Sequence, residues 1–153
     1  MAPQMTPDPM DEALAEARSA AVRGEIPVGA VVLGPDGAIL ARAGNRTEQD
    51  FDASAHAEIL ALRAAAAALN NPRLTGCDLV VTLEPCPMCA HAISLFRIRR
   101  LIFGAYDPKG GGVEHGPRIF HSSSCHHRPE IIAGVRETES ASLLRDFFRE
   151  RRQ

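Results

Sequence analysis

Apolar and polar residues alternate along the first part of the chain in patterns typical of one helix followed by a β-hairpin. Apolar side chains at a helical spacing follow Asp8-Pro9 and predict a helix that ends near Arg23. Apolar runs over Ile26–Leu33 and Ala38–Ala43 predict two strands. The Gly34-Pro35-Asp36-Gly37 segment between them is typical of a tight turn, so the two strands are expected to pair.

The rest of the chain continues with helix and strand patterns. Ser54 is predicted to cap a helix, because its hydroxyl is able to accept a hydrogen bond from the first turn. Residues 105–128 are rich in Gly and His and predict a long loop with one helical turn at Arg118–Phe120. The other predicted elements are helices over Ala55–Leu69, Pro85–Phe96 and Thr138–Arg151, and strands over Asp78–Leu83, Arg100–Gly104 and Glu130–Val135.

The order of these elements predicts the fold class. Strands and helices that alternate in this way indicate an α/β protein, a three-layer α/β/α sandwich with a five-stranded mixed sheet. We assign one domain to residues 9–153, after a proline-rich lead-in over residues 1–8 that is expected to be disordered. The sequence has neither a signal-peptide pattern nor an apolar run of about 18 residues, so a cytoplasmic location is expected.

Charge is distributed unevenly, although the formal net charge is only −2. Residues 1–93 contain 6 basic and 12 acidic residues, and residues 94–153 contain 11 basic and 7 acidic residues. All basic residues except Lys109 are arginines, a side chain that binds phosphate through parallel N–H groups. The basic C-terminal part fits a polyanionic partner, and it fits a solvated helix face equally well.

Two short motifs carry the residues for a zinc site. His56-Ala57-Glu58 begins one predicted helix, and Cys86-Pro87-Met88-Cys89 begins another. Imidazole and thiolate are ligands that Zn²⁺ prefers, and three ligands leave one tetrahedral position open for water. The positive end of a helix stabilises thiolates, and the i, i+3 spacing directs both sulfur atoms the same way. We therefore assign His56, Cys86 and Cys89 as ligands of one Zn²⁺ ion.

Glu58 is assigned as the proton-transfer group of this site. It lies two residues after His56, about 200° around a helix of 3.6 residues per turn, so it approaches the open position from the side. A structural zinc site is the alternative, and it needs a fourth Cys or His. The residues that remain for that role lack zinc-finger spacing. They are Cys77, Cys125, His91, His115, His121, His126 and His127.

With these motifs in place, the chain resembles the bacterial tRNA-specific adenosine deaminases of the cytidine deaminase-like superfamily. The pattern His-x-Glu followed by Pro-Cys-x-x-Cys specifies the superfamily. Two further segments, Asp107-Pro108-Lys109-Gly110-Gly111 and Asp146-Phe147-Phe148-Arg149, resemble the tRNA enzymes instead of the free-base deaminases. The resemblance begins near Glu12, and its other segments are Glu25–Ala30, Gly44–Arg46, Ala55–Ile59, Val81–Cys89 and Phe103–Ala105.

The resemblance implies an activity and a set of roles. The implied reaction is zinc-dependent, hydrolytic deamination of adenosine to inosine at the wobble position of an arginine tRNA. The implied enzyme is a homodimer with one Zn²⁺ ion per subunit, and Glu58 is its catalytic residue. The residues implied to contact the target base are Asn45, Pro27, Val28 and Ala57. Those implied to lie near the anticodon loop are Asp107, Lys109, Phe148, Arg149, Arg151 and Arg152.

Other functions stay open on the sequence. The zinc motif also fits a deaminase of free guanine or cytosine, or of a nucleoside, which would not bind RNA. A catalytically silent RNA-binding partner subunit is a third hypothesis, and the intact Glu58 argues against it. From residue types alone, Asn45 is more often a turn residue. Phe147 and Phe148 are more often core side chains, and one of them is expected to belong to the core.

Overall fold

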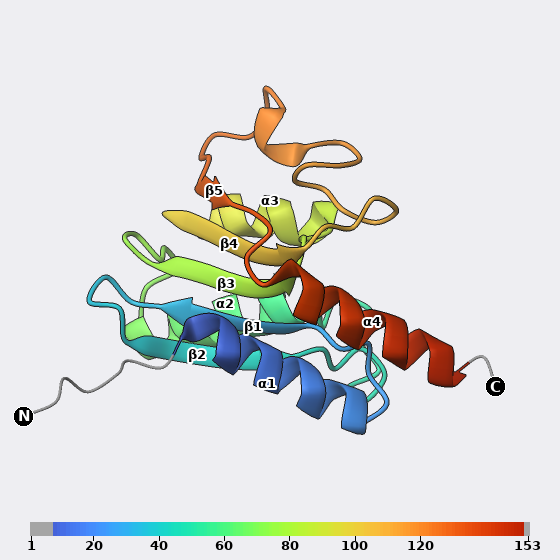
Figure 1. Ribbon diagram of the computed structural model, residues 1–153. Coiled ribbons are helices and arrows are strands. Elements are labelled where there is room, and N and C mark those ends of the chain that lie inside the picture. The colour runs from blue at the N-terminus through green and yellow to red at the C-terminus, as the bar shows by residue number, and fades with distance from the viewer. Residues whose placement is uncertain (1–7, 152–153) are drawn as a thin grey trace, which may run out of the picture.

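The computed structural model describes residues 8–151, and they form one sheet with helices on both of its faces (Figure 1). The strands lie in the order β2-β1-β3-β4-β5. β1 pairs antiparallel with β2 and β3, whereas β4 runs parallel to both β3 and β5. The strands are β1 (Gly29–Leu33), β2 (Ile39–Gly44), β3 (Asp78–Leu83), β4 (Arg100–Ala105) and β5 (Glu130–Ile132). The predicted five-stranded mixed sheet is confirmed.

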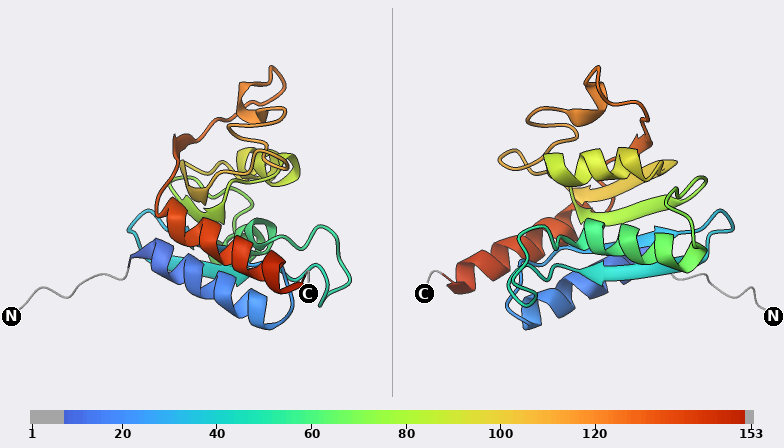
Figure 2. Two further views of the ribbon diagram at one scale, coloured as in Figure 1. Left: turned by 45° about the vertical axis from the view of Figure 1, so that its right-hand side comes forward. Right: turned by 180° about the vertical axis from the view of Figure 1, so that it is seen from behind.

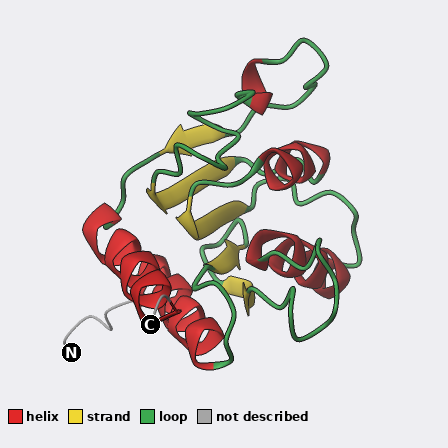
Figure 3. Cartoon of the chain, turned by 90° about the vertical axis from the view of Figure 1, so that its right-hand side faces the viewer, coloured by secondary structure: helices red, strands yellow, loops and turns green. Residues whose placement is uncertain are grey.

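Two helices cover each face of the sheet, as Figure 3 shows end-on. α1 (Pro9–Val22) and α4 (Glu137–Arg151) contact each other and lie on one face. α2 (Ala57–Leu69) and α3 (Pro87–Leu95) lie on the other. The long loop after β4 contains one 3-10 turn, η1 (Ile119–His121). The predicted three-layer α/β/α sandwich is confirmed.

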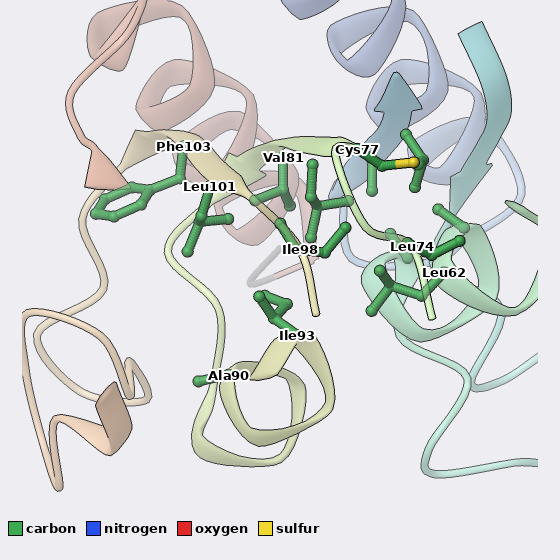
Figure 4. Close-up of a cluster of buried hydrophobic side chains, with 14 of the residues drawn as sticks. Leu62, Leu74, Cys77, Val81, Ala90, Ile93, Ile98, Leu101 and Phe103 are labelled. Carbon is green, nitrogen blue, oxygen red and sulfur yellow. The ribbon is translucent and has the colours of Figure 1, made fainter. Parts of the chain in front are cut away.

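Strand residues alternate between two hydrophobic cores. Val32 and Val81 belong to the larger core, under α2 and α3, whereas Val31 and Val80 pack toward α1. Figure 4 shows the larger core, where side chains of α2, α3, β3 and β4 meet. Burial of one such side chain stabilises the fold by about 1.5–3 kcal/mol. Because both faces of the sheet are covered, the central strands are apolar on consecutive residues.

The N-terminus of α2 differs from the sequence expectation. The helix begins at Ala57 instead of Ala55, and Ser54 does not cap it. The N–H group and the hydroxyl of Ser54 both donate to Asp52, at 2.9 and 2.7 Å. Asn45 replaces Ser54 in this role, because its Oδ1 accepts the N–H of Ala57 at 2.8 Å.

Three other elements are shorter than the sequence predicts. β1 begins at Gly29 instead of Ile26, since the N–H of Val28 turns back to the carbonyl of Ile26. β5 ends at Ile132 instead of Val135, because the chain turns at Gly134 with φ of +76°. α3 begins at Pro87 instead of Pro85. The start of α1 is as predicted, and Asp8 accepts the N–H of Met10 at 3.0 Å.

Residues 1–7, most of the predicted lead-in, lie outside the described residues, as do 152–153. Within residues 8–151, no helix combines the length and the apolar character needed to cross a membrane.

Candidate active site

Three side chains from two helix starts meet at one point. His56 Nδ1 lies 3.6 Å from Cys86 Sγ and 3.6 Å from Cys89 Sγ, and the three ligand atoms lie within 4.8 Å of one another. Zn–N and Zn–S bonds of about 2.0 and about 2.3 Å at tetrahedral angles place N and S about 3.5 Å apart. The donor set and its spacing therefore fit Zn²⁺.

Local structure explains why these ligands converge. His56 is the N-cap of α2, Cys86 is the N-cap of α3, and Cys89 lies in the first turn of α3. The hydrogen bond that Cys89 donates lowers the pKa of the Cys86 thiol to about 4, although burial opposes this. The same shared proton raises the pKa of Cys89. Helix N-termini also favour thiolates, so the pair is ready to bind a cation.

Glu58 lies beside this cluster and is almost completely buried, with 4% of its surface exposed. Burial raises the pKa of its carboxyl to about 7. A carboxyl group with a pKa near neutrality both accepts and releases protons easily, as proton transfer requires. The structure thus brings Glu58 together with the three predicted ligands.

A cavity of about 270 Å³ opens above these residues. His56, Glu58 and Cys86 form part of its lining, and Asn45 and Val28 form another part. Pro27 and Ala57 are buried next to lining residues but do not line the cavity themselves. Four residues with no role predicted from the sequence also line the cavity: Ile26, Thr47, Leu83 and Glu84.

Asn45 joins three segments at the cavity wall. Its Oδ1 accepts the N–H of Ala57, and its Nδ2 donates to the carbonyl of Ile26 at 3.2 Å. An Asn side chain has two N–H groups, so one N–H stays available for a ligand. Asn45 is therefore a helix cap as well as a candidate ligand-binding residue.

The residues predicted to lie near RNA occupy different places. Asp107 lines the cavity, and it also lines a neighbouring cavity of about 430 Å³ together with Lys109 and Phe148. Arg149 borders a third hollow beside Phe148. Arg151 instead lies over the ring of Phe147, 3.9 Å from its centroid, near α1. Arg152 lies outside the described residues.

The two consecutive phenylalanines of α4 have different surroundings. Phe147 is buried with 7% of its surface exposed, whereas Phe148 is 43% exposed. The expectation that one of them belongs to the core is confirmed. The other faces the cavity that adjoins the zinc site.

Two buried carboxylates, those of Glu25 and Glu84, hold the loops around the cavity in place through hydrogen bonds. Glu25 accepts hydrogen bonds from Thr47 and from the N–H groups of Glu48 and Gln49. Glu84 does the same for residues 107–115. The one sequence signal for Glu84 is its position two residues before Cys86. The segment after Asn45, fastened by Glu25, projects at the same end of the molecule as the C-terminus of α4 (Figure 2).

Among the described residues, no fourth Cys or His joins the three predicted ligands, as a structural zinc site would require. Within residues 8–151, His56, Cys86 and Cys89 are the one group of three potential metal ligands that converge. All four cysteines are free. His127 Nε2 donates to the carbonyl of Ile98 at 2.7 Å, and Cys125 contacts Ser94, so both have structural roles.

Comparisons with known proteins agree with this site. Residues 5–105 match the family described as the cytidine and deoxycytidylate deaminase zinc-binding region. A tRNA-specific adenosine deaminase of Agrobacterium fabrum is 57% identical over 143 residues, which cover 94% of this chain and 93% of that protein.

Solved structures are similar to the whole fold. One comes from a study of A-to-I editing by tRNA:A34 deaminases at the wobble position of transfer RNA. It has 56% identity and a TM-score of 0.87, and it covers 89% of this chain and 98% of that chain. A guanine deaminase from Nitrosomonas europaea is 25% identical with a TM-score of 0.74, over 91% of this chain and 82% of that chain.

Proposed function

The chain belongs to the cytidine and deoxycytidylate deaminase zinc-binding family and, within it, to the tRNA-specific adenosine deaminases, and on this basis we propose that it deaminates adenosine to inosine at the wobble position of an arginine tRNA. The observation that carries the proposal is the buried carboxylate of Glu58 beside three convergent zinc ligands. The single domain responsible comprises residues 9–153.

Zn²⁺ is the cofactor, and His56, Cys86 and Cys89 would hold one ion per chain. The ion would supply an acidified water as the nucleophile. Glu58 accepts the proton of the attacking water and passes it to a ring nitrogen of the base. The C6–O bond forms, and Glu58 then takes the remaining proton of the new C6 hydroxyl and delivers it to the amino group. The C6–N bond breaks, ammonia leaves, and C6 becomes a carbonyl.

The cavity wall orients the base. The free N–H group of Asn45 donates to an acceptor of the purine, and Val28 supplies an apolar surface beside it. Pro27 and Ala57 support this wall from behind. A base in a single-stranded loop enters such a cavity at low cost, because it does not need to leave a duplex.

The RNA on either side of the target would extend along the neighbouring cavity. Phe148 offers a ring for stacking, and Lys109 and Arg149 offer positive charge for phosphates. Asp107 adjoins both cavities. Arg151 ends α4, and Arg152 follows it in the sequence; both would add charge near the RNA.

A free-base deaminase is the second candidate, and the similarity to a guanine deaminase favours it. One incubation separates the two. The protein is mixed with an unmodified arginine tRNA that carries A at the wobble position, with a matched tRNA that carries G there, and with free adenosine, guanine and cytosine. Inosine formed only in the first tRNA is the expected result. Release of ammonia from a free base would favour the second candidate, and zinc-loaded protein without any turnover would favour a silent partner subunit.

We also propose that the protein is a cytoplasmic homodimer, as its resemblance to this family implies. Apolar side chains exposed on α2 and α3, such as Leu69, Met88 and Leu95, are available for a contact between subunits. Sedimentation equilibrium should give twice the mass of one chain, and a monomer at micromolar concentration would contradict the dimer.

A further inference from the structure

The mechanism above does not use a second buried carboxylate at the cavity, that of Glu84. This residue follows directly after β3, and its side chain has no exposed surface. Its Oε1 accepts the N–H of Asp107 at 3.0 Å and Nδ1–H of His115 at 2.8 Å. Its Oε2 accepts the N–H groups of Val113, Glu114 and His115 at 3.2, 2.9 and 3.1 Å. One carboxylate therefore satisfies five donors of a distant segment.

That segment, residues 107–115, contains no helix or strand of its own. Its backbone would have few partners without Glu84, and buried N–H groups without an acceptor are costly. Five donors surround the buried carboxylate, and hydrogen bonds to its charged form favour that form.

The segment packs against Glu84 as closely as glycine permits. A Cβ atom at Gly111 would lie 2.4 Å from Glu84 Oε2, and one at Gly112 would lie 2.6 Å from Pro87 N. The N–H of Gly112 also donates to the carbonyl of Pro85 at 2.8 Å. The segment is therefore held by Glu84 and by the backbone at Pro85 and Pro87, next to the start of α3, where Cys86 and Cys89 lie.

The same segment forms the outer wall of the cavity. It contributes Asp107 and Gly110 to the lining, and Lys109 to the neighbouring cavity. Asp107 in turn accepts the N–H groups of Lys109 and Gly110 at 3.2 and 2.9 Å. We propose that Glu84 is a positioning residue that holds residues 107–115 as the wall against which the substrate is bound. All hydrogen bonds of its carboxylate go to this segment, so it acts through the segment and not on the substrate.

This inference rests on the proposed deaminase function, and Glu84→Gln tests it. The substitution keeps the shape but replaces one acceptor oxygen with NH₂, so two or three of the five donors lose their acceptor. We expect one Zn²⁺ per chain to remain and amide hydrogen exchange over 107–115 to become faster. KM for the tRNA should rise about tenfold or more, and kcat should change by less than about threefold. An unchanged KM overturns the proposal, and so does loss of zinc.

Asp78→Asn is the matched control, because it removes a buried carboxylate at the other end of β3. Asp78 accepts hydrogen bonds from Arg99 at 3.0 and 2.9 Å and lies away from the cavity. This variant should lose stability and keep KM. An equal rise of KM in Asp78→Asn would mean that general destabilisation is the cause and would overturn the proposal.

Gly111→Ala gives a second test if Glu84→Gln does not fold. The added Cβ pushes the segment away from Glu84 and leaves the carboxylate intact. The same rise of KM is expected, and a normal KM counts against the proposal. Hydrogen exchange does not depend on enzymatic activity. It therefore tests whether Glu84 holds residues 107–115 even if the wild-type protein forms no inosine. Inosine formation by the wild type tests the proposed function separately.

Discussion

Glu58 is the residue on which the proposed chemistry depends. It lies beside the three predicted zinc ligands and is not one of them. Glu58→Gln keeps the size of the side chain and removes its ability to accept a proton. We expect zinc content to stay the same and kcat on the tRNA to fall by about 10²-fold or more. Metal analysis and single-turnover deamination check both parts. Substantial turnover in the zinc-loaded variant would rule out Glu58 as the proton carrier.

Asn45 has a role in folding in addition to its proposed role in ligand binding. Asn45→Ala leaves the N–H of Ala57 without its acceptor, so the free energy of unfolding should fall by about 1 kcal/mol. Ser54→Ala is the control, because the Ser54 hydroxyl bonds to Asp52 at the surface and its removal should change stability by less than about 0.5 kcal/mol. Urea denaturation measures both. If the two variants lose the same stability, Asn45 is not the cap of α2.

At the level of single residues, the sequence predicts the parts of the site that are close together along the chain. His56 directly precedes the first turn of α2, which contains Glu58, and Cys86 directly precedes the first turn of α3, which contains Cys89. Their short separation along the chain therefore keeps each pair close together. The role of Glu84 is not predictable in this way, because its hydrogen-bond partners begin 23 residues later, in a loop without periodicity. The capping of α2 by Asn45 is not predictable from local spacing either. Asn45 lies twelve positions before Ala57, whose N–H it accepts, and it caps the helix in place of the nearby Ser54.

Among the elements, α4 has a different function on each of its sides. Phe147 packs inward under Arg151, whereas Phe148 and Arg149 border the hollows beside the site. Arg149→Glu should therefore weaken tRNA binding and reduce the slope of log Kd against log salt by about one unit. Filter binding at several salt concentrations measures the slope.

Arg151→Glu serves as the comparison for Arg149→Glu. It removes the contact with the Phe147 ring, so we expect lower thermal stability in addition to any loss of binding. If Arg149→Glu binds tRNA as the wild type does at low salt, the RNA does not contact this side of α4.

The elements themselves follow from the sequence, and their ends follow less well. The order of strands and helices is confirmed, because apolar periodicity persists over whole elements. β1 and β5 are shorter than predicted, since the apolar runs continue into backbone that turns at Val28 and Gly134. Tertiary contacts determine where these strands end, and the periodicity of apolar residues does not indicate those positions.

In the whole molecule, the zinc site joins the N-termini of α2 and α3 on one face of the sheet. Removal of the ion with a chelator should abolish activity and lower the midpoint of thermal unfolding by about 5–10 °C, because bound metal stabilises the folded state only. Calorimetry with and without added Zn²⁺ checks this, and activity should return with the ion. Full activity of protein shown to be free of metal would contradict the zinc assignment.

The hydrogen bonds of Asn45 have a consequence for anyone who wishes to redirect this site to another base. A substitution at Asn45 alters the ligand contact and the start of α2 together, so its effect on selectivity cannot be separated from its effect on His56 and Glu58. Val28 borders the same cavity with an apolar side chain that forms no hydrogen bond. Libraries that vary Val28 and keep Asn45 would change the shape of the cavity while the helix that carries the chemistry stays in place.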